Sequence, residues 1–263
     1  MITLSYLDLV TLSSLVVLLG IVLALNGFTH LKQYYWANIR MVVQLLFMGV
    51  WLSWVFYAEN WIWVVLVGLI MLVAAGYEIA KRQHYNFKGG YSIWIGLFSI
   101  SLTALIMLVG VLVLIIEPDP WYQAQYAIPL LGMILGNSMT AIGLGLDSLT
   151  RNAVQLKPQI EAQLALGKTA KQAMLFIRQQ SLHTAMMPVI NMLVAAGIIS
   201  LPGMMTGQIL AGTDPAEAVK YQIMVMFLVA GSTAMGTVIA VHLASRRLFD
   251  SRQRLILDQL TKT

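Results

Sequence analysis

The sequence contains no cysteine, and only 10% of its 263 residues are charged. Without cysteine the chain has no disulfide framework, no thiolate metal site and no thiol redox chemistry, and the count says nothing about its compartment. With so few charges and 59% hydrophobic residues, a soluble domain could not cover itself with a solvated surface. The apolar runs are long rather than alternating, which excludes a transmembrane barrel. We therefore predict an all-α, polytopic integral membrane protein.

The apolar runs predict seven membrane spans, since about 20 apolar residues make one crossing. The first run has no basic segment before it, so we expect a mature span rather than a cleaved signal peptide. Internal repeats and low-complexity linkers are absent from the sequence, and we predict a single transmembrane domain over residues 1–263. The expected spans are residues 7–25, 39–56, 61–80, 91–116, 126–146, 183–200 and 222–244.

Basic residues lie almost entirely on one side of these spans. Of the 16 lysines and arginines, all except Lys220 follow the first, third, fifth or seventh span. The positive-inside rule makes those segments cytoplasmic, so we predict the N-terminus outside and the C-terminus inside a bacterial inner membrane. This asymmetry, together with anionic lipid on the inner leaflet, accounts for the net charge of +5 without nucleic-acid binding.

The apolar stretch over residues 183–212 is interrupted by Leu201, Pro202 and Gly203. Proline ends or kinks a helix, and the apolar piece that follows is too short to cross a bilayer. We expect residues 204–211 to re-enter the membrane or to lie at its outer interface.

The longest predicted cytoplasmic loop, residues 147–182, contains a docking pattern. Glu161 and Ala162 are followed by Gly167, six positions after the glutamate, and by Ile177, ten positions after the glycine. This spacing resembles the coupling loop by which importer-type ABC permeases dock on their ATPase, although Gln163 replaces a second alanine and glutamines stand where Leu-Pro would follow. It suits a helix, a glycine turn and a second helix that seat in a cleft of another protein. An ordinary amphipathic hairpin on the membrane surface is the alternative.

Gly167, Lys168 and Thr169 also imitate the end of a phosphate-binding loop. That motif needs a glycine five positions earlier, where this chain has Ala162, and no parallel-strand pattern precedes it. We therefore expect a transport subunit that has no ATPase site and binds no cofactor of its own.

Four further segments are similar to one transporter family. They read PLLGMILGNSM at 129–139, SLPGMMTG at 200–207, AGTDP at 211–215 and YQIMV at 221–225. In this order and without gaps they resemble the FetB-type permeases of iron-export ABC transporters. The resemblance implies a homodimer of permeases joined to two copies of a separate cytoplasmic ATPase, which holds ATP and Mg. It also implies export of metal from a bacterial cytoplasm, and iron as the cargo rests on the resemblance alone.

Two pairs of glycines have the spacing of close helix packing. Gly132 and Gly136 lie four apart on the fifth expected span, and Gly203 and Gly207 repeat this spacing after the break. Small residues four apart let helix backbones approach closely. We favour packing within one subunit over packing at a dimer seam.

Polar and sulfur-bearing side chains in the spans are candidates for a substrate pathway. Asn137 lies mid-span, where a polar side chain needs a partner or lines a wet path. Methionine thioethers can ligate soft ions, but they also fill helix interfaces, and we favour packing. Glu78 pairs most simply with Arg82 at i,i+4, a spacing that Asp147 and Arg151 repeat. The candidates are Asn137, Met133, Met139, Asn191, Met204, Met205 and Glu78.

The metal ligands stay unassigned at this point. Iron prefers oxygen or nitrogen ligands to thioethers, and the spans offer few of these. An iron site would then be weak, transient or built for a chelate.

The arginine-rich tail, residues 245–263, alternates basic and apolar residues. We expect a basic amphipathic helix on the inner leaflet, which could equally touch the ATPase.

Two functions compete for this sequence. The first is the ABC permease, with force entering through the loop from Glu161 to Ile177. The second is a secondary transporter or channel for a metal ion or metal chelate, driven by an ion gradient. The second predicts buried acidic or histidine relays in the spans, and these are scarce.

Overall fold

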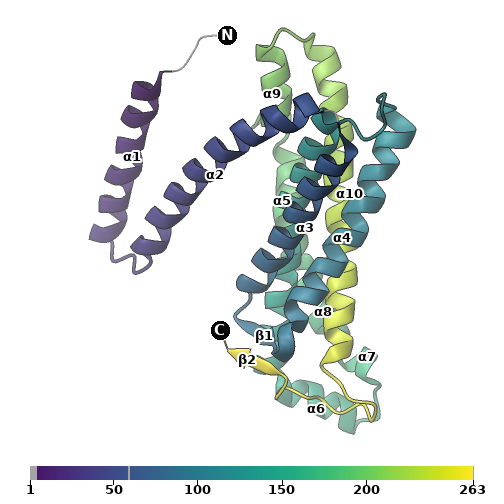
Figure 1. Ribbon diagram of the computed structural model, residues 1–263. Coiled ribbons are helices and arrows are strands. Elements are labelled where there is room, and N and C mark those ends of the chain that lie inside the picture. The colour runs from purple at the N-terminus through teal and green to yellow at the C-terminus, as the bar shows by residue number, and fades with distance from the viewer. Residues whose placement is uncertain (1–4, 59, 263) are drawn as a thin grey trace. The chain divides into compact units, whose positions relative to one another are not determined.

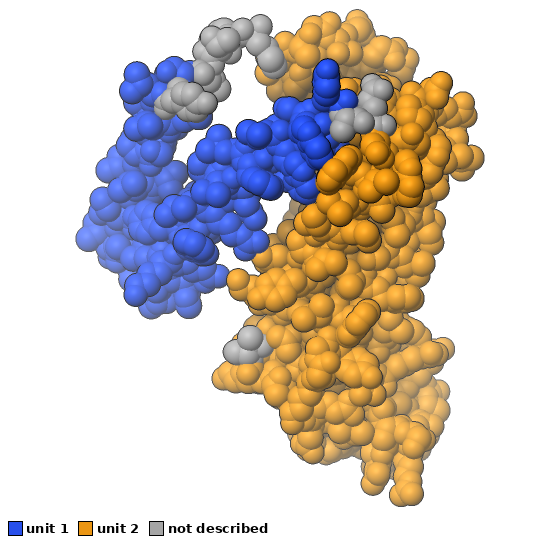
Figure 2. Space-filling view, in the orientation of Figure 1, with its two compact units in different colours: residues 1–59 blue, residues 60–263 orange. Residues whose placement is uncertain are grey.

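The computed structural model describes residues 5–58 and 60–262. The chain divides into two compact units, Met1–Glu59 and Asn60–Thr263, which have different colours in Figure 2. Among the described residues, six helices are long and apolar enough to cross a membrane. The fold is therefore all-α and polytopic, as predicted. Two such units can belong to one membrane domain, so the division neither confirms nor contradicts the predicted single transmembrane domain, which stays a prediction.

Unit 1 is a pair of helices, α1 (Tyr6–Leu25) and α2 (Leu31–Ala58) (Figure 1). The turn between them contains Gly27 at a φ of +77°, a left-handed conformation that glycine adopts without steric cost. The Tyr35 hydroxyl donates to the carbonyl oxygen of Val17 at 3.2 Å and so joins the two helices. Both helices expose long apolar side chains along most of their length, as lipid-facing helices do.

Unit 2 has two central helices, α5 and α10. In the most apolar stretch of α5, 56% of the residues are buried, against 44% in α10 and 33% in α3 and α4. α5 packs against α3, α4, α8 and α10, and α10 also packs against α4, α8 and α9. The long helices are α3 (Trp61–Lys81), α4 (Tyr91–Val111), α5 (Ala124–Gln155), α8 (Leu175–Ala195) and α10 (Pro215–Arg247).

Short elements connect the long helices of unit 2. A π-helical turn, η2, extends α4, and two three-residue strands form a small antiparallel sheet. The short elements are β1 (Tyr85–Phe87), η1 (Lys88–Gly90), η2 (Leu112–Ile116), α6 (Lys157–Ala165), α7 (Ala170–Ala173), α9 (Gly203–Leu210) and β2 (Leu260–Lys262).

The sixth expected span, 183–200, is not among the six apolar helices. α8 begins earlier, at Leu175, so its first turns carry the polar residues around Arg178 and lower its mean hydropathy. Its 21 residues rise about 31 Å, which matches the thickness of a bilayer hydrocarbon core. The count of seven spans stays a prediction.

The break after this helix is confirmed. α8 ends at Ala195, and Pro202 precedes the eight-residue helix α9. Eight residues rise only about 12 Å, so α9 alone cannot cross a bilayer. Its depth in the membrane stays a prediction.

Three segments far apart in the sequence meet at one end of unit 2, where Figure 1 shows β1, β2, α6 and α7. β1 pairs with β2, and the Lys88 N–H donates to the Gln259 carbonyl oxygen at 2.8 Å. The Ala170 N–H donates to Gln253 Oε1 at 2.8 Å. The basic segments after α3, after α5 and after α10 therefore share one end, as the charge pattern predicted. The side of the membrane on which they lie stays a prediction.

The expected amphipathic helix over 245–263 is wrong. α10 ends at Arg247, and the Asp250 carboxylate accepts hydrogen bonds from the N–H groups of Arg252 and Arg254 at 2.9 and 2.8 Å. An aspartate that bonds the backbone ahead of it favours a turn over a helix. The N–H and guanidinium of Arg254 lower the pKa of Asp250. The tail then runs back to form β2, with Leu248 fully buried beneath it.

Candidate functional site

The predicted coupling loop folds as a helical hairpin, α6 and α7, between α5 and α8. At the end of α6, Gly167 has a φ of +81°. Its N–H donates to the carbonyl oxygen of Leu164 at 2.9 Å, and the Lys168 N–H donates to that of Gln163 at 3.1 Å. This is the Schellman arrangement by which a glycine ends a helix. Thr169 then caps α7, and the expected helix, glycine turn and second helix are confirmed.

The hairpin has a buried inner face and an exposed outer face. Ile160 and Ile177 are each 2% exposed and belong to the core of unit 2. Glu161, Ala162 and Gly167 are exposed. Three of the four predicted docking residues are thus available to a partner, while Ile177 lies buried on α8, just after the hairpin. Docking on an ATPase stays a prediction.

A groove of about 300 Å³ opens on the hairpin between α6 and α8. Apolar side chains and glutamines line it, which suits contact with another protein better than chemistry on a small molecule. Beside it, Glu161 pairs with Lys157 at 3.7 Å, and both side chains are about half exposed, so the pair contributes little stability. The groove is lined by Leu156, Gln159, Ile160, Gln163, Lys168, Gln172, Ala173, Leu175, Phe176, Ile177 and Gln179.

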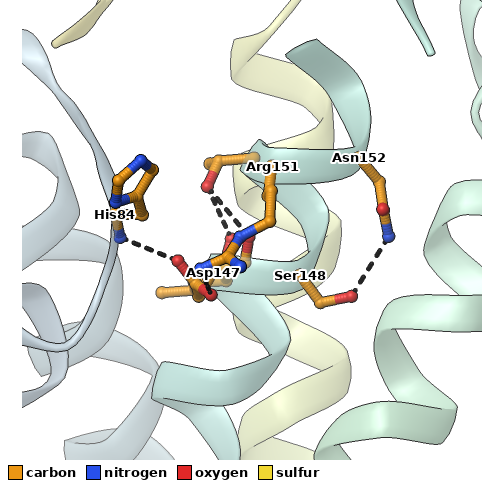
Figure 3. A network of polar contacts seen from close by, with 7 residues as sticks. His84, Asp147, Ser148, Arg151 and Asn152 are labelled. Carbon is orange, nitrogen blue, oxygen red and sulfur yellow. Dashed lines mark hydrogen bonds and ion pairs between the residues drawn. The ribbon is translucent and has the colours of Figure 1, made fainter. Parts of the chain in front are cut away.

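Asp147 connects α5 to the loop after α3 (Figure 3). Its Oδ1 accepts a hydrogen bond from the backbone N–H of His84 at 2.7 Å, and its Oδ2 pairs with Arg151 at 3.0 Å. The i,i+4 pair expected between Asp147 and Arg151 is therefore confirmed. The bond to His84 could not be read from the sequence, because 63 residues separate the two positions.

The four predicted packing glycines occupy different environments. A Cβ added at Gly132 would lie 3.3 Å from Cε of Met71 on α3. For Gly136, Gly203 and Gly207, no neighbouring atom of the described chain lies within 4 Å of such a Cβ. Close approach within the subunit is therefore seen only at Gly132, and the other three glycines leave open surface.

Close helix packing occurs instead at glycines that the sequence reading passed over. A Cβ on Gly96 of α4 would lie 2.8 Å from Cγ2 of Ile79 on α3. A Cβ on Gly145 of α5 would lie 3.2 Å from both Ala185 of α8 and Thr237 of α10. At Gly145, α5 therefore approaches both α8 and α10 closely.

The pathway candidates are distributed over α3, α5, α8 and α9. Asn137 Nδ2 donates to the Met133 carbonyl oxygen of its own helix at 2.9 Å. Met133, Met139 and Met204 pack against the core, as the packing interpretation expects. The remaining candidates are exposed Asn191 and half-buried Met205 and Glu78. In the described part of the chain no three His, Asp or Glu side chains lie close enough to hold a metal ion together.

A seam of buried hydroxyl groups runs between α4, α5 and α10, and the sequence analysis missed it. Ser138 Oγ lies 3.4 Å from Ser232 Oγ and 3.2 Å from Thr233 Oγ1, and all three residues are fully buried. Within the described ranges, 5–58 and 60–262, Ser99 Oγ and Thr237 Oγ1 are buried without a hydrogen-bond partner. The signal was a weak one, since single serines and threonines in apolar helices usually bond their own backbone. This hydroxyl seam is made of Ser99, Thr103, Ser138, Ser232, Thr233 and Thr237.

Comparisons with known proteins agree with this architecture. Residues 6–249 match the model of the family described as "Uncharacterised protein family (UPF0014)". A UPF0014 membrane protein of Synechocystis sp. is 37% identical over 91% of this chain and 93% of the relative. The "Probable iron export permease protein FetB" of Escherichia coli is 35% identical over 88% of this chain and 87% of the relative. "Protein ALUMINUM SENSITIVE 3" of Arabidopsis thaliana is 32% identical over 91% and 86%. No solved structure matches the chain.

The similarity to the FetB-type permeases that the sequence predicted is confirmed, and it extends over most of the chain. The apolar helices and the bacterial relatives make this a multi-pass protein of the bacterial inner membrane. Together with the match over residues 6–249, they show that the chain belongs to the UPF0014 family of membrane proteins.

Proposed function

We propose that this chain is the membrane-spanning subunit of an ABC transporter that exports iron, acting as a homodimer with two copies of a separate ATPase. The observation that carries the proposal is the α6–α7 hairpin, which presents Glu161 and Ala162 on an exposed face while Ile160 of α6 is buried in the core beside it, as is Ile177 at the start of α8. The name of the E. coli relative, a probable iron export permease, supports the cargo and the direction of transport.

The hairpin is built to transmit movement into the helices that would form the route. It continues directly into α5 and α8, and at Gly145 α5 approaches both α8 and α10 closely. Packed helices move as rigid bodies rather than deforming. A displacement of α6 and α7 by the nucleotide state of the ATPase would therefore tilt α5 and α8 together against α10.

The hydroxyl seam is the proposed route for the cargo. A buried hydroxyl without a partner costs about 1–3 kcal/mol, so Ser99 and Thr237 are costly in the arrangement observed. If α10 moves away from α4 and α5, these oxygens gain water or cargo as partners. Oxygen ligands also suit iron better than the methionine thioethers, which pack in the core.

The open glycines support the homodimer. Gly136 on α5 and Gly203 and Gly207 on α9 meet no neighbouring atom within the described chain. Exposed small residues four apart are a surface on which a second helix can lie closely. This supports the dimer seam, the alternative that the sequence reading ranked second.

The test is metal-dependent ATP hydrolysis by the partner ATPase, reconstituted with this chain in liposomes. We compare the wild-type chain with Glu161→Lys and with Glu217→Lys as a matched control. Glu217 resembles Glu161 because it is also a helical glutamate paired with a lysine, and its side chain is 56% exposed against 54%. It lies in the first turn of α10, at the opposite end of that helix from the tail.

Ferrous iron should stimulate hydrolysis with the wild-type chain and with Glu217→Lys, but not with Glu161→Lys. If the chain neither binds the ATPase nor alters its rate, the ABC assignment is wrong and a transporter driven by an ion gradient takes its place. If hydrolysis is coupled but responds to a different metal, the coupling assignment stands and iron is replaced as the cargo.

A further inference from the structure

A second cavity, of about 270 Å³, lies where α7, α8, the end of α10 and the tail meet. It is separate from the groove on the hairpin, because the two share no lining residue. Four of its lining residues can carry positive charge, namely Lys171, Arg178, His242 and Arg246, and none is acidic. The remaining lining residues are Thr169, Ala170, Ser245, Phe249 and Gln253.

These basic groups are held together without a carboxylate among them. No ion pair is recorded for Lys171, Arg178 or Arg246 within residues 5–58 and 60–262. Asp250, the acidic residue next to the lining in sequence, is paired with Arg254 at 2.8 Å. Like charges gathered around one cavity repel each other, so this cluster is unfavourable unless an anion occupies the cavity.

Arg178 indicates the kind of ligand that the cavity would hold. Its Nε is buried and donates no hydrogen bond, although the residue as a whole is only half-buried. An unused donor on a buried guanidinium costs free energy that an anionic oxygen at this position would recover. Ser245, only 7% exposed, adds a hydroxyl to the same wall.

We propose that this cavity binds a phosphate group, with Arg178 and Arg246 as its principal ligands and Lys171 and His242 beside them. A guanidinium offers paired N–H donors that match two oxygens of a phosphate. The phosphate can belong to an anionic lipid headgroup or to a soluble phosphate. The lipid is the source that the position favours, because the cavity lies at the basic end of unit 2, which the positive-inside rule predicts to be cytoplasmic. Basic pockets between membrane helices on that side bind such headgroups.

The bound group would tie the coupling hairpin to the tail. Lys171 belongs to α7, Arg178 to α8 and Arg246 to α10, while the Ala170 N–H is already bonded to Gln253 of the tail. The proposal does not depend on the identity of the cargo or on the ATPase, since the ligands come from this chain alone.

The experiment is native mass spectrometry of the full chain in detergent, with phosphatidylglycerol or phosphatidylcholine added. The wild-type chain should retain one phosphatidylglycerol and no phosphatidylcholine. Arg178→Gln with Arg246→Gln should weaken retention by about tenfold or more, since hydrogen bonds to charged groups are lost. Arg252→Gln is the matched control, because it removes an exposed charge from the same end of the protein outside the cavity.

Millimolar inorganic phosphate distinguishes the two sources. If it displaces the lipid from the wild-type chain and binds one per chain in its place, the ligand is a soluble phosphate and the site stands. If it does not compete, the headgroup is the ligand. Lys171→Gln, a single change at an exposed residue, replaces the double variant if circular dichroism shows that the latter does not fold. Equal loss in Arg252→Gln, or no retained phosphate of either kind, would overturn the proposal.

Discussion

Removing the Asp147 carboxylate should loosen the end of unit 2 where the hairpin and the tail meet. Asp147 accepts one hydrogen bond from the His84 N–H at 2.7 Å and pairs with Arg151 at 3.0 Å. Asp147→Ala loses both and leaves the His84 N–H without its acceptor. A hydrogen bond to a charged group contributes about 1.5–3 kcal/mol, whereas an exposed i,i+4 ion pair contributes about 0.3–0.5 kcal/mol.

The two contributions can be separated because Arg151→Gln removes only the ion pair. The Arg151 side chain is 49% exposed and that of Asp147 only 19%, so the ion pair is screened at one end while the acceptor of His84 is largely covered. We expect Asp147→Ala to cost about 2 kcal/mol and Arg151→Gln less than about 0.5 kcal/mol. For a domain of this size, 1 kcal/mol corresponds to roughly 2–4 °C in melting temperature. The melting temperature should therefore fall by roughly 4–8 °C in Asp147→Ala and by no more than about 2 °C in Arg151→Gln.

The assay is thermal unfolding in detergent, followed by intrinsic tryptophan fluorescence. Asp147→Asn should lie between the two variants, because its amide oxygen can still accept from His84 while the ion pair is lost. Equal melting temperatures for Asp147→Ala and Arg151→Gln would refute the reasoning, since they would mean that the bond to His84 adds nothing to the ion pair.

Four further variants test the packing and the tail. Gly96→Ala should destabilise the chain by about 1–3 kcal/mol through overpacking against Ile79, whereas Gly136→Ala should stabilise the monomer by up to about 1 kcal/mol. Thermal melting of the monomer in detergent measures both. Thr237→Val should leave the melting temperature unchanged or raised, because its hydroxyl has no partner, and a fall would contradict the seam as described. The pKa of Asp250 is lowered in the folded protein, so its ionised carboxylate stabilises the tail turn at pH values above the ordinary pKa of 3.8. This stabilisation is lost as the pH falls through the lower pKa of the folded protein. The hydrogen-exchange protection factors of β2, which are corrected for the intrinsic pH dependence of amide exchange, should therefore fall on acidification, and Asp250→Asn should remove this step.

Hydropathy located the membrane helices because apolar length is nearly the only requirement of a span. It placed their ends less well, since a helix continues past the bilayer wherever packing supports it. α5 runs on to Gln155 because Leu149 and Ala153, four apart, are both fully buried. α8 is long enough to span but is not among the apolar helices for the same reason, since its first turns, next to the hairpin, are polar.

The tail shows where periodicity misled the prediction. The apolar residues after Arg247 have helical spacing, but Leu248 is buried in the core, and Phe249, Leu255 and Leu257 also pack against it. Asp250 decides the local conformation, because its carboxylate bonds two backbone N–H groups that a helix would need elsewhere. A pairing with β1, more than 170 residues earlier in the chain, leaves no local signal.

The glycines show that a packing motif identifies a helix face but not the helix that packs against it. The four-residue spacing singled out two pairs of glycines, Gly132 with Gly136 and Gly203 with Gly207. Of these, only Gly132 approaches another helix within the described chain. Gly96 and Gly145, which approach neighbouring helices closely, have no glycine four positions away. Spacing states which residues share a helix face, whereas the partner that meets this face is fixed by the tertiary fold. Glycines that contact no other helix of this chain are therefore the better guide to an interface between subunits. Glycines that contact a neighbouring helix mark the places where a movement of the hairpin would be transmitted to α10.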